Sequence, residues 1–252
     1  MSDLKINNPW ILSPKSNDPT LLNLICFPPG GCGASIFNNW SKYLPPEIAV
    51  RAIQLPGRET RFKEASFSSM DALIIELLIG ILPYIQNSPF AVFGHSVGAL
   101  IGFEFVRQLY QNQLPVPEHL IVSGRRAPHI PLDKILHLEP DTKLLEELRL
   151  IGGTSNIILD DPELMSLFLP IVRADFTINE TYEIPTNPYV NCPILALGTT
   201  EDYLVDQSSL EQWKSYTTNE FEVAMLSGGH MAFKENPQDL LNVVGKKVLK
   251  KP

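Results

Sequence analysis

The segment Phe90-Ala91-Val92-Phe93-Gly94-His95-Ser96-Val97-Gly98 decides the fold. Its first four residues are apolar and predict a buried strand, and the apolar segment that begins at Val97 predicts a helix. Between strand and helix, Gly94, Ser96 and Gly98 form a G-x-S-x-G motif. The glycines permit a turn too tight for side chains, and this turn exposes the Ser96 hydroxyl at the positive end of the helix dipole. We therefore interpret Ser96 as a nucleophile, with a capping serine in a tight turn as the alternative.

Strands and helices are expected to alternate on both sides of this motif. Short apolar runs that end in Gly, Pro or Ser predict strands at 21–27, 49–55, 90–96, 119–124, 192–199 and 221–226. Helical periodicity predicts helices at 67–85, 97–114 and 237–249. Strands that are apolar on both faces and alternate with helices are typical of a mostly parallel sheet with helices on both faces. The sequence therefore predicts an α/β fold.

One interval breaks this alternation. Between Arg125 and Pro185, about 60 residues separate two expected strands, and two amphipathic segments in the interval each begin at an aspartate that can cap a helix, Asp141 or Asp161. We expect a single domain over residues 1–252, with a core at about 18–127 and 186–252 and a helical lid insertion at 128–185. The apolar residues of the insertion would cover a substrate, or would simply pack on the sheet.

A nucleophilic serine needs a base, and the base needs an acid to orient it. In α/β-hydrolases the chain order is serine, acid, histidine. Of the five histidines only His230 follows both the serine and a plausible acid, on the loop between the last expected strand and the final helix. His95 stands beside the nucleophile, and the other three histidines come too early. We therefore predict His230 as the base.

The acid is expected on the loop after the strand at 192–199, where three carboxylates compete. Asp202 follows the strand end directly and is the predicted acid. Glu201 remains the alternative, although its side chain is expected to point the other way. Asp206 is expected to cap the helix that follows it.

Acyl transfer also requires donors for the oxyanion of the tetrahedral intermediate. The backbone amide of Val97 supplies one donor, and the glycine-rich loop after the first strand, Pro28 to Gly33, is expected to supply the other, with Gly30 as first choice. The loop lacks the GK[ST] ending of a phosphate-binding loop. Cys32 in this loop is expected to be a packed side chain because no histidine is placed to activate it.

Composition excludes several classes of function. The chain has 252 residues, 44% hydrophobic and 19% charged, with a formal net charge of -8. Nucleic-acid binding draws its affinity from clustered Lys and Arg, and a membrane span requires roughly 20 consecutive apolar residues. The sequence has neither feature, apart from a short lysine tail at 246–251, and it has no secretory signal pattern. Three cysteines without metal or redox spacing indicate a reduced protein without a metal site. We expect a cytoplasmic monomer.

Several segments resemble one particular group of α/β-hydrolases. They are FPPGGCGASIFNNW (27–40), QLPGRETRF (54–62), GHSVGALIGFE (94–104), SGRRAPH (123–129), LPIVRADFTINETY (169–182) and CPILALGTTEDYLV (192–205). From about Leu21 to Leu249 the chain is similar to the type II, or editing, thioesterases that accompany nonribosomal peptide and polyketide synthases. It is also similar to the related medium-chain fatty-acid synthase thioesterases.

This resemblance implies a substrate and a partner. The substrate is an acyl group in thioester linkage to the 4'-phosphopantetheine arm of an acyl or peptidyl carrier protein, and the enzyme itself needs no cofactor. Ser96 would attack the thioester with His230 as base, Asp202 would orient His230, and the Val97 and Gly30 amides would hold the oxyanion.

Two other functions stay open. A medium-chain fatty-acyl thioesterase or a general serine esterase would use the same residues. A non-catalytic binding protein on a hydrolase fold would be expected to have a damaged triad, whereas Ser96, Asp202 and His230 are all present and in order.

Four arginines are candidates for a further role: Arg58, Arg61, Arg125 and Arg126. They could form buried ion pairs that hold loops together, with Glu59 or Asp175 as partner, or they could contact an acidic carrier protein. For Arg58 and Arg126 we favour the structural role.

Overall fold

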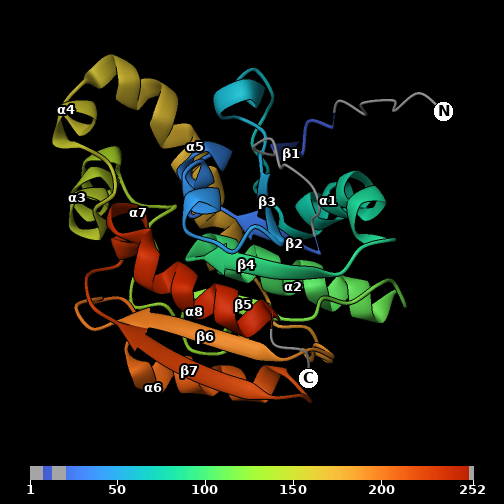
Figure 1. Cartoon of the computed structure of the whole chain (residues 1–252). Helices are drawn as coiled ribbons and strands as arrows, with labels where there is room; N and C mark the ends of the chain where they lie inside the picture. Colours follow the sequence, from blue (N-terminus) through green and yellow to red (C-terminus); the bar gives the residue numbers. More distant parts are fainter. Residues whose placement is uncertain (1–7, 13–20, 250–252) are drawn as a thin grey trace.

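A seven-stranded sheet forms the centre of residues 8–12 and 21–249, which the computed structural model describes. The strand order is β1-β3-β2-β4-β5-β6-β7, and each pair of neighbours is parallel except β1 and β3 (Figure 1). The strands are β1 (Ile11–Leu12), β2 (Leu22–Phe27), β3 (Ile48–Ile53), β4 (Phe90–His95), β5 (Leu120–Ser123), β6 (Ile194–Thr199) and β7 (Phe221–Leu226). The six strands predicted from sequence are confirmed. The antiparallel β1 was not predicted, because two residues are too short to show a pattern.

Side chains of alternate residues enter two separate cores, one on each face of the sheet. On β2, Ile25 and Phe27 belong to one core and Leu24 and Cys26 to the other. The period of two residues in a strand produces this division, and burial on both faces explains why the strands are continuously apolar.

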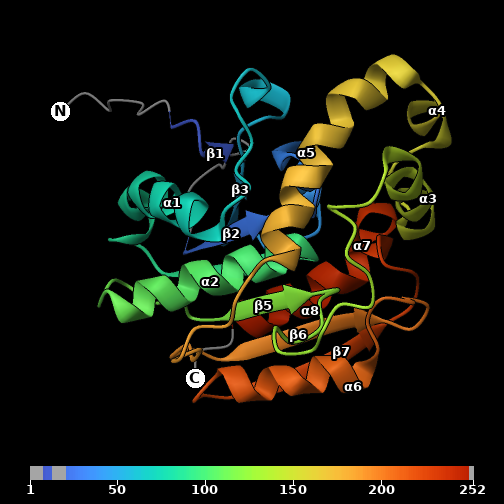
Figure 2. The same cartoon turned by 180° about the vertical axis from the view of Figure 1, so that it is seen from behind.

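Helices cover both faces, as predicted (Figures 1 and 2). The first core lies under α1 (Met70–Ile85), α2 (Val97–Gln111), α6 (Gln207–Glu211) and η4 (Gln212–Tyr216). The second lies under η1 (Ala34–Phe37), η2 (Trp40–Lys42), α7 (Ala232–Glu235) and α8 (Pro237–Leu249). The short η3 (Glu59–Arg61) lies in the loop after β3. The expected helices at 67–85, 97–114 and 237–249 correspond to α1, α2 and α8.

Three helices lie between β5 and β6 in the chain: α3 (Asp141–Ile151), α4 (Asn156–Leu159) and α5 (Pro162–Glu180). Both views show α3 beside α7 at one end of the molecule (Figures 1 and 2). Lys234 of α7 donates a hydrogen bond to the carbonyl of Gly153, just after α3. This contact joins the insertion to the loop and helix that follow β7.

One of the two predicted helix caps in this region is wrong. Asp161 accepts hydrogen bonds from the backbone amides of Glu163 and Leu164, at 2.9 and 3.1 Å, and caps α5 as predicted. Asp141 does not cap α3. Pro140 occupies the N-cap position, and the Asp141 carboxylate lies in the first turn, where it pairs with Arg173 of α5 at 2.6 Å. A long-range ion pair thus replaces the expected local contact.

Some sequence predictions concern residues outside the described ranges. These are the start of the core at residue 18, the absence of a secretory signal in the first residues, and the end of the lysine tail at Lys250 and Lys251. Within the described ranges, no helix is long and apolar enough to cross a membrane.

Candidate active site

Ser96 occupies a strained turn between β4 and α2. Its backbone has φ 53° and ψ -121°, outside the regions that residues with a side chain ordinarily adopt. The flanking glycines make this turn possible. A Cβ on Gly94 would lie 2.2 Å from the carbonyl oxygen of Gly98, and one on Gly98 would lie 2.4 Å from that of Phe27. The motif therefore has the tight geometry expected from sequence, and Ser96 stands at the N-cap of α2.

Asp202 and His230 lie in direct contact on the loops after β6 and β7. His230 Nδ1 and Asp202 Oδ2 are 2.7 Å apart, and their side chains are only 4% and 1% exposed. The other Asp202 oxygen accepts a hydrogen bond of 2.9 Å from the Leu204 amide, which fixes the carboxylate. With Nδ1 held by the carboxylate, Nε2 is the ring nitrogen available to a substrate or a nucleophile.

The two competing carboxylates of this loop lie elsewhere. Glu201 is exposed. Asp206 accepts a hydrogen bond of 2.8 Å from the Ser209 amide and caps α6, as predicted.

Ser96 and His230 line the same cavity, which has a volume of about 190 Å³. The described residues show no hydrogen bond between the Ser96 hydroxyl and the His230 ring. Such contacts are often long in hydrolases without substrate.

The two residues predicted to supply the oxyanion amides lie close together. A Cβ on Gly30 would be 3.3 Å from Cγ2 of Val97. Neither the Gly30 nor the Val97 amide donates a hydrogen bond to another of the described residues. The Gly31 amide, in contrast, donates to Asp175 Oδ2 at 2.7 Å. Both amides are therefore without a partner among the described residues, and Val97 lines the cavity together with Ser96.

A buried ion pair holds the glycine-rich loop in place. Arg58 donates two hydrogen bonds to Asp175, at 2.6 and 2.9 Å, and the two side chains are 5% and 3% exposed. Arg58 also donates to the carbonyl of Cys32 at 3.3 Å. The structural role predicted for Arg58 is confirmed, with Asp175 as its partner. Sequence reasoning did not foresee the bond from Gly31, because only the fold brings α5 to this loop.

Arg126 also has the structural role that we favoured. It donates to the carbonyls of Pro131 and Leu204, at 2.9 and 2.7 Å, and pairs with Asp133 at 2.8 Å. These bonds link the loop after β5 to the loop that carries Asp202.

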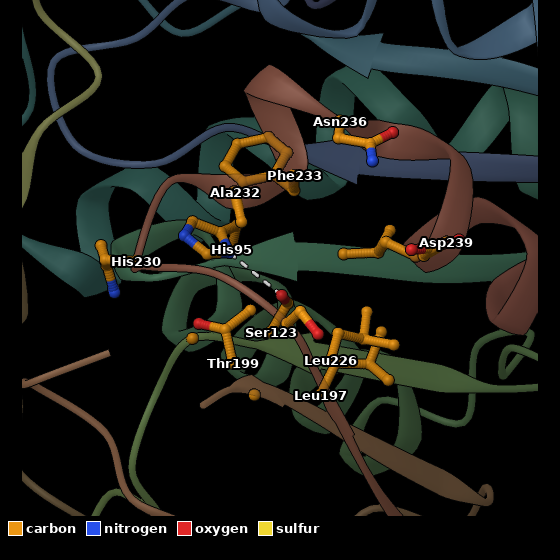
Figure 3. Close-up of a pocket in the computed structure, with 14 residues that line it drawn as sticks. His95, Ser123, Leu197, Thr199, Leu226, His230, Ala232, Phe233, Asn236 and Asp239 are labelled. Carbon is orange, nitrogen blue, oxygen red and sulfur yellow. Dashed lines mark hydrogen bonds between the residues drawn. The ribbon is translucent and has the colours of Figure 1, made fainter. Parts of the chain in front are cut away.

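His95 lies next to His230 but has a different environment. Its Nδ1 is 3.0 Å from Ser123 Oγ, a hydrogen bond that Figure 3 shows, and its ring centroid is 4.9 Å from that of His230 and 4.3 Å from that of Phe233. Burial lowers the pKa of His95 well below its ordinary value, and the nearby His230 lowers it further. His95 is therefore a neutral ring that supports one side of His230. The sequence gives no sign of this contact.

Cys32 is a poor nucleophile, as predicted. Burial raises the pKa of its thiol to about 11, so the thiol stays protonated at neutral pH. In residues 8–12 and 21–249 no cluster of His, Cys, Asp and Glu has the arrangement of a metal site.

The parallel sheet, the strained serine turn and the Asp–His pair on the loops after later strands together define the α/β-hydrolase class. A family model described as "Thioesterase domain" matches residues 22–248. The chain therefore belongs to the thioesterase family and is a thioester hydrolase.

Comparison with known proteins supports the same assignment. The chain is 41% identical to the gramicidin S biosynthesis protein GrsT of Aneurinibacillus migulanus, over 96% of this chain and 94% of that one. It is 33% identical to the human medium-chain S-acyl fatty acid synthase thioesterase, over 85% and 82% of the two chains. Its fold matches the solved structure of BorB, the type II thioesterase of the borrelidin biosynthetic cluster, with a TM-score of 0.85, 32% identity and coverage of 95% and 97%. The resemblance to type II thioesterases is confirmed.

Proposed function

We propose that this thioesterase removes acyl or aminoacyl groups from the 4'-phosphopantetheine arm of carrier proteins, as an editing enzyme of nonribosomal peptide or polyketide biosynthesis. The relatives support this role, because GrsT is described as a gramicidin S biosynthesis protein and BorB as a type II thioesterase. The partner is then an acyl or peptidyl carrier protein that docks transiently.

The first half of the reaction transfers the acyl group to the enzyme. Ser96 Oγ attacks the thioester carbonyl carbon while His230 Nε2 accepts the hydroxyl proton. Asp202 stabilises the imidazolium that forms, and the Gly30 and Val97 amides donate hydrogen bonds to the oxyanion. When the intermediate collapses, the C–S bond breaks and His230 returns the proton to the pantetheine sulfur, so that a free thiol leaves.

The second half releases the acid. Water attacks the acyl-Ser96 ester carbonyl while His230 accepts a proton from the water, and the same two amides stabilise the second oxyanion. His230 then returns the proton to Ser96 Oγ. The products are a carboxylic acid and the original enzyme, and no cofactor takes part.

One observation carries this proposal: a serine with a strained backbone lies in the same cavity as a histidine whose other ring nitrogen is held by a buried aspartate. This arrangement has a cost in backbone strain and in the burial of charge, which proteins tend to accept at functional sites.

We also propose that the chain is one domain whose segment 128–185 acts as a lid. Phe176 and Asn179 of α5 line the cavity beside Ser96, together with Leu132 and Leu136 of the loop before α3. Residues of the insertion thus form part of the wall against which an acyl group would rest.

The test uses a carrier protein loaded with an acyl group on its phosphopantetheine arm. We expect the enzyme to remove the acyl group, and mass spectrometry of the intact carrier protein measures the loss of its mass. Ser96→Ala should lower the rate by several powers of ten. Ser208→Ala, which changes an exposed serine of α6, is the matched control and should retain the wild-type rate. Survival of the acyl-carrier during long incubation with a folded enzyme would contradict the proposal.

The fatty-acyl thioesterase is the second candidate, because the human medium-chain enzyme is among the relatives. The same assay separates the two functions when medium-chain acyl-carrier is compared with short acyl-carrier and with simple oxyesters. A general esterase would hydrolyse oxyesters at least as fast as thioesters.

A further inference from the structure

The cavity beside Ser96 contains several charged side chains, and most of them already have partners. Glu180 accepts hydrogen bonds from the amides of Leu136 and His137. The remaining contacts are the pair of Lys134 with Glu147 at 2.7 Å, the bond from Tyr203 to Glu147 at 3.3 Å, and the pair of Arg126 with Asp133 at 2.8 Å. Each of these charged groups therefore already has a partner among the described residues.

Arg125 differs from all of them. It lines the same cavity and is only 7% exposed, yet no carboxylate of the described residues forms an ion pair with its guanidinium. Its Nε is buried without a hydrogen-bond partner. Burial, and next the charge of Arg126, lower the pKa of Arg125 to about 10, while the Glu180 carboxylate of the same cavity acts in the opposite direction without forming an ion pair with Arg125. The group therefore remains a cation at neutral pH. A buried and unpaired cation is among the rarest arrangements in a folded protein.

The backbone of Arg125 is held firmly. Its carbonyl oxygen accepts a hydrogen bond of 2.7 Å from Nε1 of Trp213, a side chain that is fully buried. The preceding Gly124 has φ +57°, a conformation that disfavours other residues. The chain therefore fixes this arginine at the cavity wall.

A second unsatisfied group lies in the same cavity but comes from another element. Oδ1 of Asn179, on α5, is buried and has no hydrogen-bond partner. Roughly 90% or more of buried polar atoms in native proteins are hydrogen-bonded. Two exceptions in one cavity, beside the nucleophile, indicate that a ligand supplies the missing partners.

We propose that Arg125 and Asn179 form an anchor for an oxygen atom of the acyl group beyond the thioester carbonyl. The anchor selects short acyl groups that carry a carboxylate or a carbonyl over alkyl groups of similar size. The Arg125 guanidinium donates to that oxygen, and the Asn179 amide can turn to donate or to accept. The Gly30 and Val97 amides are left for the oxyanion. This inference rests on the proposed function and names the acyl class that the site accepts.

The test compares butyryl, acetoacetyl and malonyl thioesters, which have similar size but carry an alkyl end, a carbonyl or a carboxylate. Each is presented on a carrier protein and also as an N-acetylcysteamine thioester, and kcat/KM is measured. For the wild type we expect at least one oxygenated acyl group to exceed butyryl by roughly 10- to 100-fold, the range for a hydrogen bond to a charged group. A larger effect for malonyl identifies a carboxylate, and a larger effect for acetoacetyl identifies a carbonyl.

Arg125→Met and Asn179→Leu should each reduce this preference to near one, because each variant loses more kcat/KM on the oxygenated acyl groups than on butyryl. Lys134→Met is the matched control, because it removes a cation of the same cavity that already pairs with Glu147. It should keep the preference of the wild type. The melting temperature supplies a second readout: Arg125→Met should raise it, since an apolar side chain replaces an unpaired buried charge. An arginine with a purely structural role would give the opposite shift.

Equal rates on the three acyl groups in the wild type would overturn the anchor. So would an Arg125→Met variant that loses stability and slows all three substrates equally. Failure of the proposed function gives a different pattern: the carrier-bound thioesters would persist, while the N-acetylcysteamine thioesters are hydrolysed and still report the preference.

Discussion

Asp175 accepts two hydrogen bonds from the buried Arg58 guanidinium, and one of the same carboxylate oxygens accepts a third from the amide of Gly31. A residue of α5 thereby fixes the loop after β2 next to the serine turn. The neighbouring Gly30 amide, the proposed oxyanion donor, has no hydrogen-bond partner among the described residues, and its loop is held by a carboxylate 145 positions away in the chain, from Gly30 to Asp175.

Asp175→Asn should therefore damage both stability and catalysis. Removal of one partner of a buried pair leaves an uncompensated charge and typically costs about 3–5 kcal/mol. A displaced oxyanion donor lowers kcat by about 100- to 1000-fold. Urea unfolding and thioester hydrolysis measure the two effects. Asp160→Asn breaks an exposed pair with Arg149 and should cost at most about 1 kcal/mol with no change in kcat. Similar losses of stability and of kcat in Asp175→Asn and Asp160→Asn would contradict the special role of the buried pair of Arg58 with Asp175.

Sequence reasoning predicts those parts of the structure that depend on short-range patterns. The six long strands, the serine turn and the cap at Asp206 follow from a period, a steric limit and a local hydrogen bond. The chain order also predicts Asp202 and His230 as partners, and the structure places their side chains 2.7 Å apart. Three other contacts join residues far apart in the chain, and no local pattern encodes them. They are the ion pair of Asp141 with Arg173, the hydrogen bond from Gly31 to Asp175 and the packing of His95 on His230.

The unpaired state of Arg125 illustrates the same limit. Arg125 and Arg126 are adjacent in one motif and have the same chemistry, so the sequence gives no reason to distinguish them. In the structure, Arg126 reaches Asp133 and two backbone carbonyls, whereas Arg125 turns into the core and lines the cavity. Only the strand-to-loop geometry after β5 determines which of the two arginines is free to bind a ligand.

The serine turn should tolerate no side chain at Gly98. A Cβ there would lie 2.4 Å from the carbonyl oxygens of both Phe27 and Pro28, which are backbone atoms that cannot move aside locally. Gly98→Ala should therefore destabilise the protein by about 1–3 kcal/mol, as overpacking typically does. Gly229→Ala is the control for stability, because a Cβ at Gly229 meets no atom within 4 Å. Chemical unfolding of both variants measures the difference, and equal midpoints would contradict the steric account.

Substitution of two aspartates in the same loop should affect catalysis very differently. Asp202→Asn removes the charge that orients His230 and should lower kcat by about four orders of magnitude, while the fold persists. Asp206→Asn keeps a side chain that can cap α6, so it should leave kcat within about threefold and cost less than about 1 kcal/mol. Glu201→Gln tests the alternative acid and should also remain active. Should Glu201→Gln lose activity while Asp202→Asn keeps it, the assignment of the acid would be wrong.

Acid should destabilise the protein partly through His95. Burial holds its pKa well below the ordinary value of 6.5, so between these two values the unfolded chain binds a proton that the folded protein excludes. The free energy of unfolding must then fall as the pH drops below 6.5, by at most about 1.4 kcal/mol per pH unit for this one group. The free energy of unfolding stops falling through this group once the pH is below the pKa of His95 in the folded protein. Above pH 6.5 the stabilisation linked to the neutral His95 is fully present.

His95→Gln removes this titration and should flatten the pH dependence between pH 6.5 and 5, even if it lowers stability overall through the lost packing on Phe233. The pKa of His119 is also lowered by burial, but this residue is present in both proteins and cancels in the difference. Urea unfolding at several pH values in this range measures the two slopes. Parallel curves for wild type and variant would show that His95 takes up its proton in the folded state as readily as in the unfolded one.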